Sequence, residues 1–179
     1  MEITAFGIYD WKTIKKYHHF HNFKRNKLKK ASVPIVLIAL VISFLGFLVG
    51  YLLDGLDSTL ITLLIVEIIA AFLLFFTWFI MPRISFNLNK LAKNNKNEYV
   101  FKDETFIAAC KAKDISGSTE ISYKKLNSIY ETEDFLYIYI SMNQAFIVEK
   151  ASVSGGSLEE LRTHLINNMK TGKYRFAFK

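Results

Sequence analysis

The chain of 179 residues has one cysteine, two prolines and two tryptophans. The single thiol, Cys110, excludes an intrachain disulfide and a zinc site built from several cysteines, and it is typical of a reducing compartment. A nucleotide-binding P-loop is also missing, because Gly155 and Gly156 have no flanking Lys that would complete it. These absences exclude a disulfide scaffold and the most recognisable phosphate-binding loop.

Residues that carry catalysis are scarce as well. Cys110 lies among alanines in an alternating stretch, a setting for an inert buried thiol, and the acidic residues of the C-terminal half show no convergent spacing. His18, His19 and His21 lack the i, i+4 pairing with a nearby acid that zinc hydrolases use, so we interpret them as polar histidines near a membrane interface. We therefore expect no enzyme, no catalytic residue, no metal site and no cofactor.

What the chain does have is two long apolar runs, residues 33–53 and 60–81, of 21 and 22 residues. At roughly 1.5 Å per residue, each run is long enough as a helix to cross the ~30 Å hydrocarbon core of a bilayer. Only six residues join the runs, so the sequence predicts a transmembrane helical hairpin with a tight turn. Both ends of the chain then lie on the same side of the membrane.

Within the hairpin, three residues stand out as candidates for helix packing or partner contact. Gly46 and Gly50 have the GxxxG spacing that allows helix backbones to approach closely. Glu67 is the one ionisable residue inside the two runs, and an antiparallel hairpin places it at about the depth of Gly46, roughly 10 Å inside the outer surface. A carboxylate there costs on the order of 2.5 to 3.5 kcal/mol, so we expect it to be protonated or turned toward a partner.

Charge predicts the orientation. Residues 11–32 hold eight cations and no acid, whereas the turn between the runs carries only Asp54 and Asp57. The positive-inside rule then gives a multi-pass membrane protein with both termini in the cytoplasm. The expected contacts with anionic lipid are Lys12, Lys15, Lys16, Lys24, Arg25, Lys27, Lys29, Lys30 and Arg83.

The net charge of +7 therefore belongs to the segments beside the membrane. Residues 98–179 hold 11 basic and 11 acidic residues, so this part is neutral. A nucleic-acid-binding protein would carry its basic patch on the folded domain, so membrane lipids are the expected partner of these charges and nucleic acid is not. A protein partner and a second copy of the chain stay open as further partners.

From residue 98 the hydrophobic period changes to two, and short polar joints separate the segments, which predicts an antiparallel meander. The predicted strands are 98–102, 105–113, 118–123, 128–132, 135–141 and 145–150. Ser157 and Glu160 form a capping box for a helix over 158–169, whose apolar stripe needs a sheet to cover. Tyr174 to Lys179 alternates aromatic and basic residues, typical of a last edge strand or a membrane-surface contact.

The N-terminal nine residues alternate as a short strand, and Asp10 is placed to cap a basic, aromatic helix from Trp11. Pro82 and Arg83 are expected to close the second membrane helix. The predicted organisation is 1–32 (strand and basic juxtamembrane helix), 33–81 (hairpin), 82–97 (basic connector) and 98–179 (cytoplasmic β domain).

The pattern of two spans, a small antiparallel sheet and a closing helix, together with FLYIYISMNQAFIVEKASVS and the Ser157 helix, resembles the YcxB-like family of bacterial membrane proteins. The resemblance is best over residues 98–169, and this chain has Glu149 before the basic residue that ends the strand, where proline is common in the family. The resemblance implies a pleckstrin-homology-like β domain, a bent sheet closed by a C-terminal helix, and carries no catalytic residues. The fold class is thus membrane α+β.

Two functions fit these features. The first is a non-enzymatic module that holds a small domain at the inner leaflet and binds a protein or lipid, with the sheet edge and the loops around residues 152–157 as the expected contact. The alternative is an immunity protein against a membrane-active toxin or bacteriocin, in which Gly46, Gly50 and Glu67 would face the toxin. That alternative follows from architecture alone.

Overall fold

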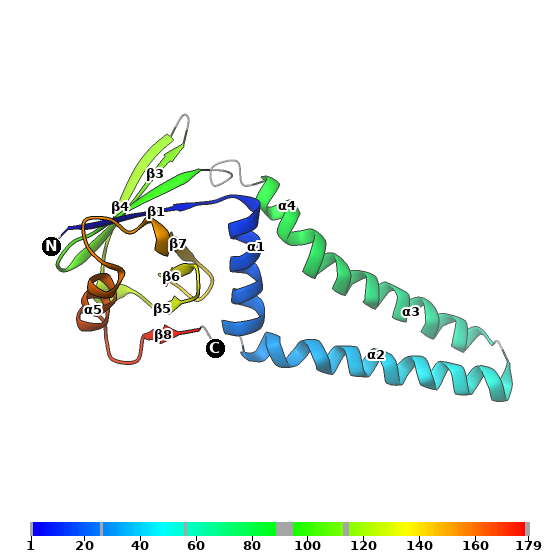
Figure 1. The fold of residues 1–179 in the computed structure, drawn as a ribbon. Coiled ribbons are helices and arrows are strands. Elements are labelled where there is room, and N and C mark those ends of the chain that lie inside the picture. The colour runs from blue at the N-terminus through cyan, green and yellow to red at the C-terminus, as the bar shows by residue number, and fades with distance from the viewer. Residues whose placement is uncertain (1, 26, 56, 89–94, 113–114, 178–179) are drawn as a thin grey trace. The chain divides into compact units, whose positions relative to one another are not determined.

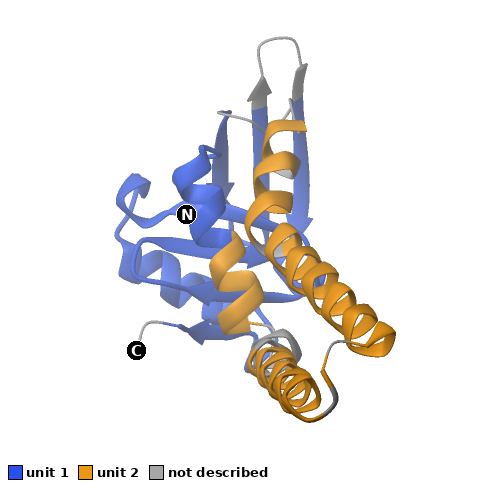
Figure 2. Cartoon of the chain, turned by 90° about the vertical axis from the view of Figure 1, so that its right-hand side faces the viewer, with its two compact units in different colours: residues 1–17, 89–179 blue, residues 18–88 orange. Residues whose placement is uncertain are grey.

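The computed structural model describes residues 2–25, 27–55, 57–88, 95–112 and 115–177, and the chain divides into two compact units (Figure 2). The β unit comprises residues 1–17 and 89–179, and the helical unit comprises residues 18–88. The structure thus groups the N-terminal strand with the sheets, whereas the sequence had placed it with the basic helix in a separate segment, 1–32.

The β unit holds two four-stranded sheets (Figure 1). The strands are β1 (Ile3–Ile8), β2 (Lys96–Phe101), β3 (Thr105–Ala112), β4 (Ile115–Ser122), β5 (Ser128–Glu131), β6 (Phe135–Tyr139), β7 (Ala145–Glu149) and β8 (Tyr174–Phe176). Their order is β1-β2-β3-β4 in one sheet and β7-β6-β5-β8 in the other. The predicted strands are all present within a few residues of their expected limits, but they divide between two sheets, and β8 pairs with β5 in parallel.

Strand β1 links the two sheets. It pairs antiparallel with β2, and its alternation buries Ile3, Ala5 and Gly7. Gly7 has no side chain because the backbone of β7 passes there: a Cβ at this position would overlap the carbonyl oxygen of Ile147. Ile147 N–H also donates to the Tyr9 hydroxyl at 3.2 Å. The N-terminal strand is therefore part of the core of the β unit.

Strand β6 is buried on both faces, which explains why all five of its residues are hydrophobic or aromatic. Leu136 and Ile138 belong to the core between the sheets. On the opposite face, the ring of Tyr17, from helix α1 (Trp11–His19), lies 5.5 Å from the Tyr137 ring and 6.2 Å from the Tyr139 ring. The first two turns of α1 therefore cover the outer face of this sheet.

Helix α5 (Leu158–Asn168) closes the core with its apolar stripe, in which Leu161 and Leu165 are fully buried. The predicted capping box is confirmed, because Ser157 Oγ accepts from Glu160 N–H at 3.1 Å and Glu160 Oε2 accepts from Ser157 N–H at 2.7 Å. Gly172, at φ 79°, makes the turn that leads to β8.

The helical unit contains long helices that flank one short turn. Its elements are a π-helical segment (Phe20–Arg25), α2 (Lys27–Asp54), α3 (Ser58–Phe75), a second π-helical segment (Phe76–Ile80) and α4 (Met81–Leu88). Asp57 caps α3 by accepting from Leu60 N–H at 2.7 Å, and Gly55 has φ 75° at the end of α2. Two helical stretches, Pro34–Leu53 and Ser58–Phe75, are long and apolar enough to cross a membrane.

The prediction that Pro82 and Arg83 end the second helix is wrong, because α4 continues through both to Leu88. Proline lacks an N–H and its ring clashes with the carbonyl four residues earlier, so regular α-helical bonding cannot continue through Pro82, which lies inside the helical run from Ser58 to Leu88. The π segment directly before α4 shifts the hydrogen bonding, so that Met81 N–H donates to the Phe76 carbonyl.

Candidate functional site

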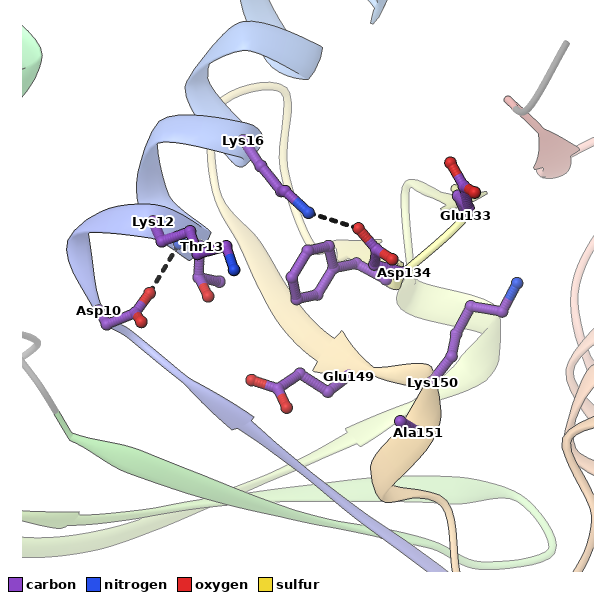
Figure 3. A pocket seen from close by; sticks show the side chains of 10 residues that line it. Asp10, Lys12, Thr13, Lys16, Glu133, Asp134, Glu149, Lys150 and Ala151 are labelled. Carbon is purple, nitrogen blue, oxygen red and sulfur yellow. Dashed lines mark hydrogen bonds and ion pairs between the residues drawn. The ribbon is translucent and has the colours of Figure 1, made fainter.

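The described part of the β unit has an open groove of about 400 Å³ between the first turns of α1 and the ends of β6 and β7 (Figure 3). We call it the α1–β7 groove. Its lining is Asp10, Lys12, Thr13, Lys16, Glu133, Asp134, Phe135, Glu149, Lys150 and Ala151. Three lysines and four acids thus surround one aromatic ring.

The helical wall of the groove is fixed by its own N-cap. Asp10 has the predicted capping role, because its Oδ1 accepts from Thr13 N–H at 2.7 Å. One helical turn later, Lys16 Nζ lies 2.5 Å from Asp134 Oδ2 and 5.6 Å from the centre of the Phe135 ring. The helix is thereby tied to the β5–β6 turn, and Lys12 stays exposed at the rim.

The strand wall is fixed by an ion cluster behind it. Lys150 Nζ lies 2.8 Å from Oε1 of Glu131, a fully buried side chain. Arg162, from α5, contacts both oxygens of the same carboxylate, Nε to Oε2 at 2.9 Å and NH2 to Oε1 at 2.8 Å. Tyr174 of β8 donates to Oε2 at 2.5 Å. One carboxylate therefore joins β5, the end of β7, α5 and β8.

The electrostatics of this cluster favour the ionised carboxylate. Burial alone would raise the pKa of Glu131, but the hydrogen bonds from Arg162, Lys150 and Tyr174 together lower it to about 2. The same carboxylate raises the pKa of Arg162 above its usual range, and burial with the bond to Glu131 does the same for Tyr174. A buried charge needs such partners, so the cluster stabilises the fold behind the groove.

The chemistry of the groove is that of recognition between polar groups. Its carboxylates and ammonium groups lie around Phe135, and several of them are already engaged: Lys16 pairs with Asp134, Lys150 pairs with Glu131, and Asp10 caps its helix. Among the residues that the structure describes, no three His, Cys, Asp or Glu side chains are placed to hold a metal ion. The groove suits a ligand that carries both charges, such as a peptide segment.

The loop at residues 152–157, predicted as a contact surface, is largely engaged within the β unit. Thr4 and Ser154 exchange backbone hydrogen bonds of 2.9 Å each, and the Ser152 hydroxyl lies 2.8 Å from both the nitrogen and the carbonyl oxygen of Phe6. The loop therefore holds β1 in place, and less of it is available to a partner than the sequence suggested.

The basic residues expected at the membrane surface fall into three groups. Lys12 and Lys15 are exposed on α1, and Lys16 is paired with Asp134. In the helical unit, Lys24 and Arg83 are exposed and Arg25 is half-buried. The side chains of Lys27, Lys29 and Lys30 are not among those that the structure describes, so the lipid contacts predicted for them stay a prediction.

The three candidates for contact within the membrane, Gly46, Gly50 and Glu67, have different surroundings. Gly50 lies against Leu60, whose Cδ2 would be 2.9 Å from a Cβ at Gly50, whereas a Cβ at Gly46 would have no atom of the described residues within 4 Å. Gly50 thus allows contact between α2 and α3, and Gly46 does not. Glu67 is half-buried, and its Oε1 is buried without a hydrogen-bond partner among the described residues.

Two features of the site were missed from the sequence. Glu131 stands in a strand where an outward-facing acid is ordinary, and its partners are 19, 31 and 43 residues away. The Lys16 to Asp134 pair spans 118 residues. A signal existed only for Glu131, because the alternation of β5 places it on the same face as Ile129, which lies in the core.

Residues 101–165 match the model of a family described as YcxB-like protein, and this range runs from the last residue of β2 into α5. No curated protein and no solved structure matches the chain. The predicted resemblance is confirmed over that range, and residues 101–165 are a YcxB-like segment.

Proposed function

We propose that the protein is a non-enzymatic, membrane-anchored interaction module. In this proposal the helical hairpin spans the bacterial cell membrane with both termini in the cytoplasm. The β unit, a pleckstrin-homology-like domain, lies at the inner leaflet and binds a protein partner through the α1–β7 groove. Basic residues beside the hairpin contact anionic lipid.

One observation carries the proposal: the two apolar helices are inserted between two neighbouring strands of one sheet. Ile8 is the register partner of Lys96, and Tyr9 N–H donates to the Asn95 carbonyl at 3.0 Å. The chain therefore leaves this sheet after β1 and returns to it beside β1 at β2. Such a connection agrees with an even number of membrane crossings, which keeps a folded domain on one side.

The charges support the orientation. Lys24, Arg25 and Arg83 lie at the ends of the hairpin that lead to the β unit, whereas Asp57 lies at the turn. Anionic lipid of the cytoplasmic leaflet attracts such basic flanks, and each exposed Lys or Arg contributes about 1 kcal/mol. The pleckstrin-homology-like assignment is supported by two packed sheets that α5 closes at one end.

The charge of the α1–β7 groove favours a protein over a lipid headgroup as its ligand. Its four acids outnumber its three lysines, and the buried carboxylate of Glu131 lies behind Lys150. An anionic headgroup would meet net repulsion there, whereas a peptide with basic and acidic side chains would find partners for both. Lipid contact then belongs to the exposed basic residues, among them Lys15 and Lys24.

Site-specific photocrosslinking tests the proposal in the native membrane. A photoreactive residue replaces Lys12 or Glu133 at the rim of the groove, and a matched control replaces Lys124, which is also exposed but lies outside the groove. We expect a protein adduct from both groove positions and a much weaker one from the control. Equal labelling at all three positions would contradict a specific groove.

Topology is tested separately. A reporter that works only outside the cytoplasm should be active when inserted beside Asp57 and silent when fused after Lys179. Recovery of a secreted toxin crosslinked at Gly46 or Glu67 would replace the interaction module by the immunity alternative.

A further inference from the structure

On each of the two long helices the less exposed side chains form one stripe, and we call these two stripes together the seam. On α3, the side chains that are less exposed than their neighbours recur every three or four residues, at Leu60, Leu64, Glu67, Ala70 and Leu74. On α2, the corresponding positions are Val36, Leu40, Phe47 and Gly50. This spacing is the 3.5-residue repeat of two packed helices, and Ser43 occupies the one position of the α2 series that is exposed.

The contact between Gly50 and Leu60 sets the level of each pair along the seam. In an antiparallel pair, a step away from the turn on one helix matches an equal step on the other. Glu67 lies seven residues beyond Leu60, and Ser43 lies seven residues before Gly50. Glu67 is therefore level with Ser43, three residues along α2 from Gly46.

Ser43 and Glu67 are also the only polar members of this series. The positions on either side of them hold Leu, Ala, Val, Phe or Gly. Glu67 Oε1 is buried and lacks a hydrogen-bond partner among the described residues. In hydrocarbon a lone oxygen of this kind is unfavourable. The structure has no hydrogen bond between Ser43 and Glu67, but a serine hydroxyl at the same level of the facing helix is a suitable donor for this oxygen.

We propose that the Ser43 hydroxyl donates a hydrogen bond to Glu67 Oε1 in the bilayer. This bond clamps together the halves of α2 and α3 that lie away from the turn. The inference rests on the proposed insertion of the hairpin in the membrane. It makes Ser43 and Glu67 positioning residues of the hairpin itself and assigns to Glu67 an intrachain role in place of a partner contact. The turn holds the other half of the seam, because Gly50 and Leu60 lie next to it.

Disulfide trapping in native membranes tests the clamp in the full chain, with Cys110→Ser as the background. The reporter pair is Val36→Cys with Leu74→Cys, at the same level of the seam and two turns beyond the clamp. The control pair is Phe47→Cys with Leu64→Cys, between the clamp and the turn. We expect both pairs to form intrachain disulfides under mild oxidation.

Adding Glu67→Leu or Ser43→Ala should then slow oxidation of the reporter pair by about threefold to fifteenfold, the range measured for interhelical hydrogen bonds in membranes. The control pair should change little, and Glu67→Gln should behave as the wild type because its amide keeps an Oε1 acceptor. A reporter pair that oxidises equally fast in Glu67→Leu overturns the clamp. Disulfides between chains in place of intrachain ones overturn it in favour of a second copy.

Membrane insertion is scored in the same samples by resistance to alkaline extraction. A chain that alkali extracts refutes the proposed anchoring, whereas an inserted chain with an unaffected reporter pair refutes only the clamp. The two failures are therefore distinguishable.

Discussion

The β unit and the helical unit have similarly apolar elements but opposite burial. All five residues of β6 are buried, whereas Leu52 and Leu53 in α2 are 78% and 77% exposed. The β unit buries its apolar surface between its two sheets and under α1 and α5. The helices leave theirs exposed along nearly their whole length, as lipid-facing helices do.

The way the two units are joined adds to this contrast. The helices are an insertion between β1 and β2, and the backbone groups at its two ends are hydrogen-bonded, Tyr9 to Asn95. Such an insertion leaves the pairing of the flanking strands intact. The β unit should therefore keep its fold without the hairpin, but not without β1.

The largest expected effect comes from replacing the hairpin. Residues 26–94 are exchanged for about 15 Gly and Ser residues, a flexible linker with a root-mean-square span near 20 Å. Helix α1 and the π segment after it, residues 11–25, are together about 22 Å long, and the linker has to span that distance back to β2. We expect a soluble monomer with the β spectrum of the full chain, measured by size exclusion and circular dichroism without detergent.

The fragment 98–179 is the control for that design. It lacks β1, and with it the buried Ile3 and Ala5, so it should aggregate or stay unfolded. A fragment 98–179 as soluble and cooperative as the linked chain would remove β1 from the core.

The next effect tests the close approach of β1 to β7. Gly7→Val places a side chain where the carbonyl oxygen of Ile147 already lies, so the strand must move away from the sheet. We expect a loss of at least about 3 kcal/mol in the free energy of unfolding, measured by urea titration of the linked chain. Gly117→Ala, whose added Cβ meets nothing within 4 Å among the described residues, should change it by less than about 0.5 kcal/mol.

Glu131 gives the third effect, which depends on pH. The pKa of this carboxyl falls from its ordinary value of 4.5 to about 2 in the folded chain. Its stabilisation is therefore fully present above about pH 4.5 and is lost as the pH falls toward 2. The shift corresponds to about 3 kcal/mol, the order of magnitude by which Glu131→Gln should destabilise the chain at pH 7.

The measurement compares unfolding free energies of wild type and Glu131→Gln in the linked chain at pH 7 and pH 3. The difference between the two proteins should shrink at the lower pH, because at pH 3 the Glu131 carboxyl of the unfolded chain is protonated and folding has to release that proton. Glu133→Gln, an exposed neighbour, is the matched control and should follow the wild type. A constant difference across the pH range would mean that Glu131 acts through packing alone.

The sequence predicted those parts of the fold that have a local signal. Six strands, the cap at Asp10 and the capping box at Ser157 all depend on residues within a few positions of each other. The pairing of β1 with β2 joins residues about ninety positions apart. The alternation of a strand shows which face is buried but does not identify the strand that pairs with it. For the same reason the division into two sheets was not foreseen.

The candidate site was harder to predict for a physical reason. The α1–β7 groove is formed by side chains from residues 10–16 and 133–151, which only the folded chain brings together. Helix α4 contains Pro82 because a π segment precedes it, and no residue type in the sequence predicts such a segment. Where local chemistry decides, as at the hairpin turn, the sequence was a good guide.

The smallest expected effect is a difference in vesicle binding between variants of two neighbouring lysines of α1, measured in the linked chain. Lys15 is exposed, whereas Lys16 is paired with Asp134, so part of its charge is already balanced. Lys15→Ala should weaken binding to vesicles of phosphatidylglycerol and phosphatidylcholine about fivefold, since one cation near an anionic surface is worth about 1 kcal/mol. Lys16→Ala should weaken it less, and both effects should fade as salt shortens the screening length from about 10 Å. Cosedimentation measures the binding. If the two variants lost equal affinity, the pairing with Asp134 would not hold Lys16 away from lipid, and the groove and the lipid surface would have to share that residue.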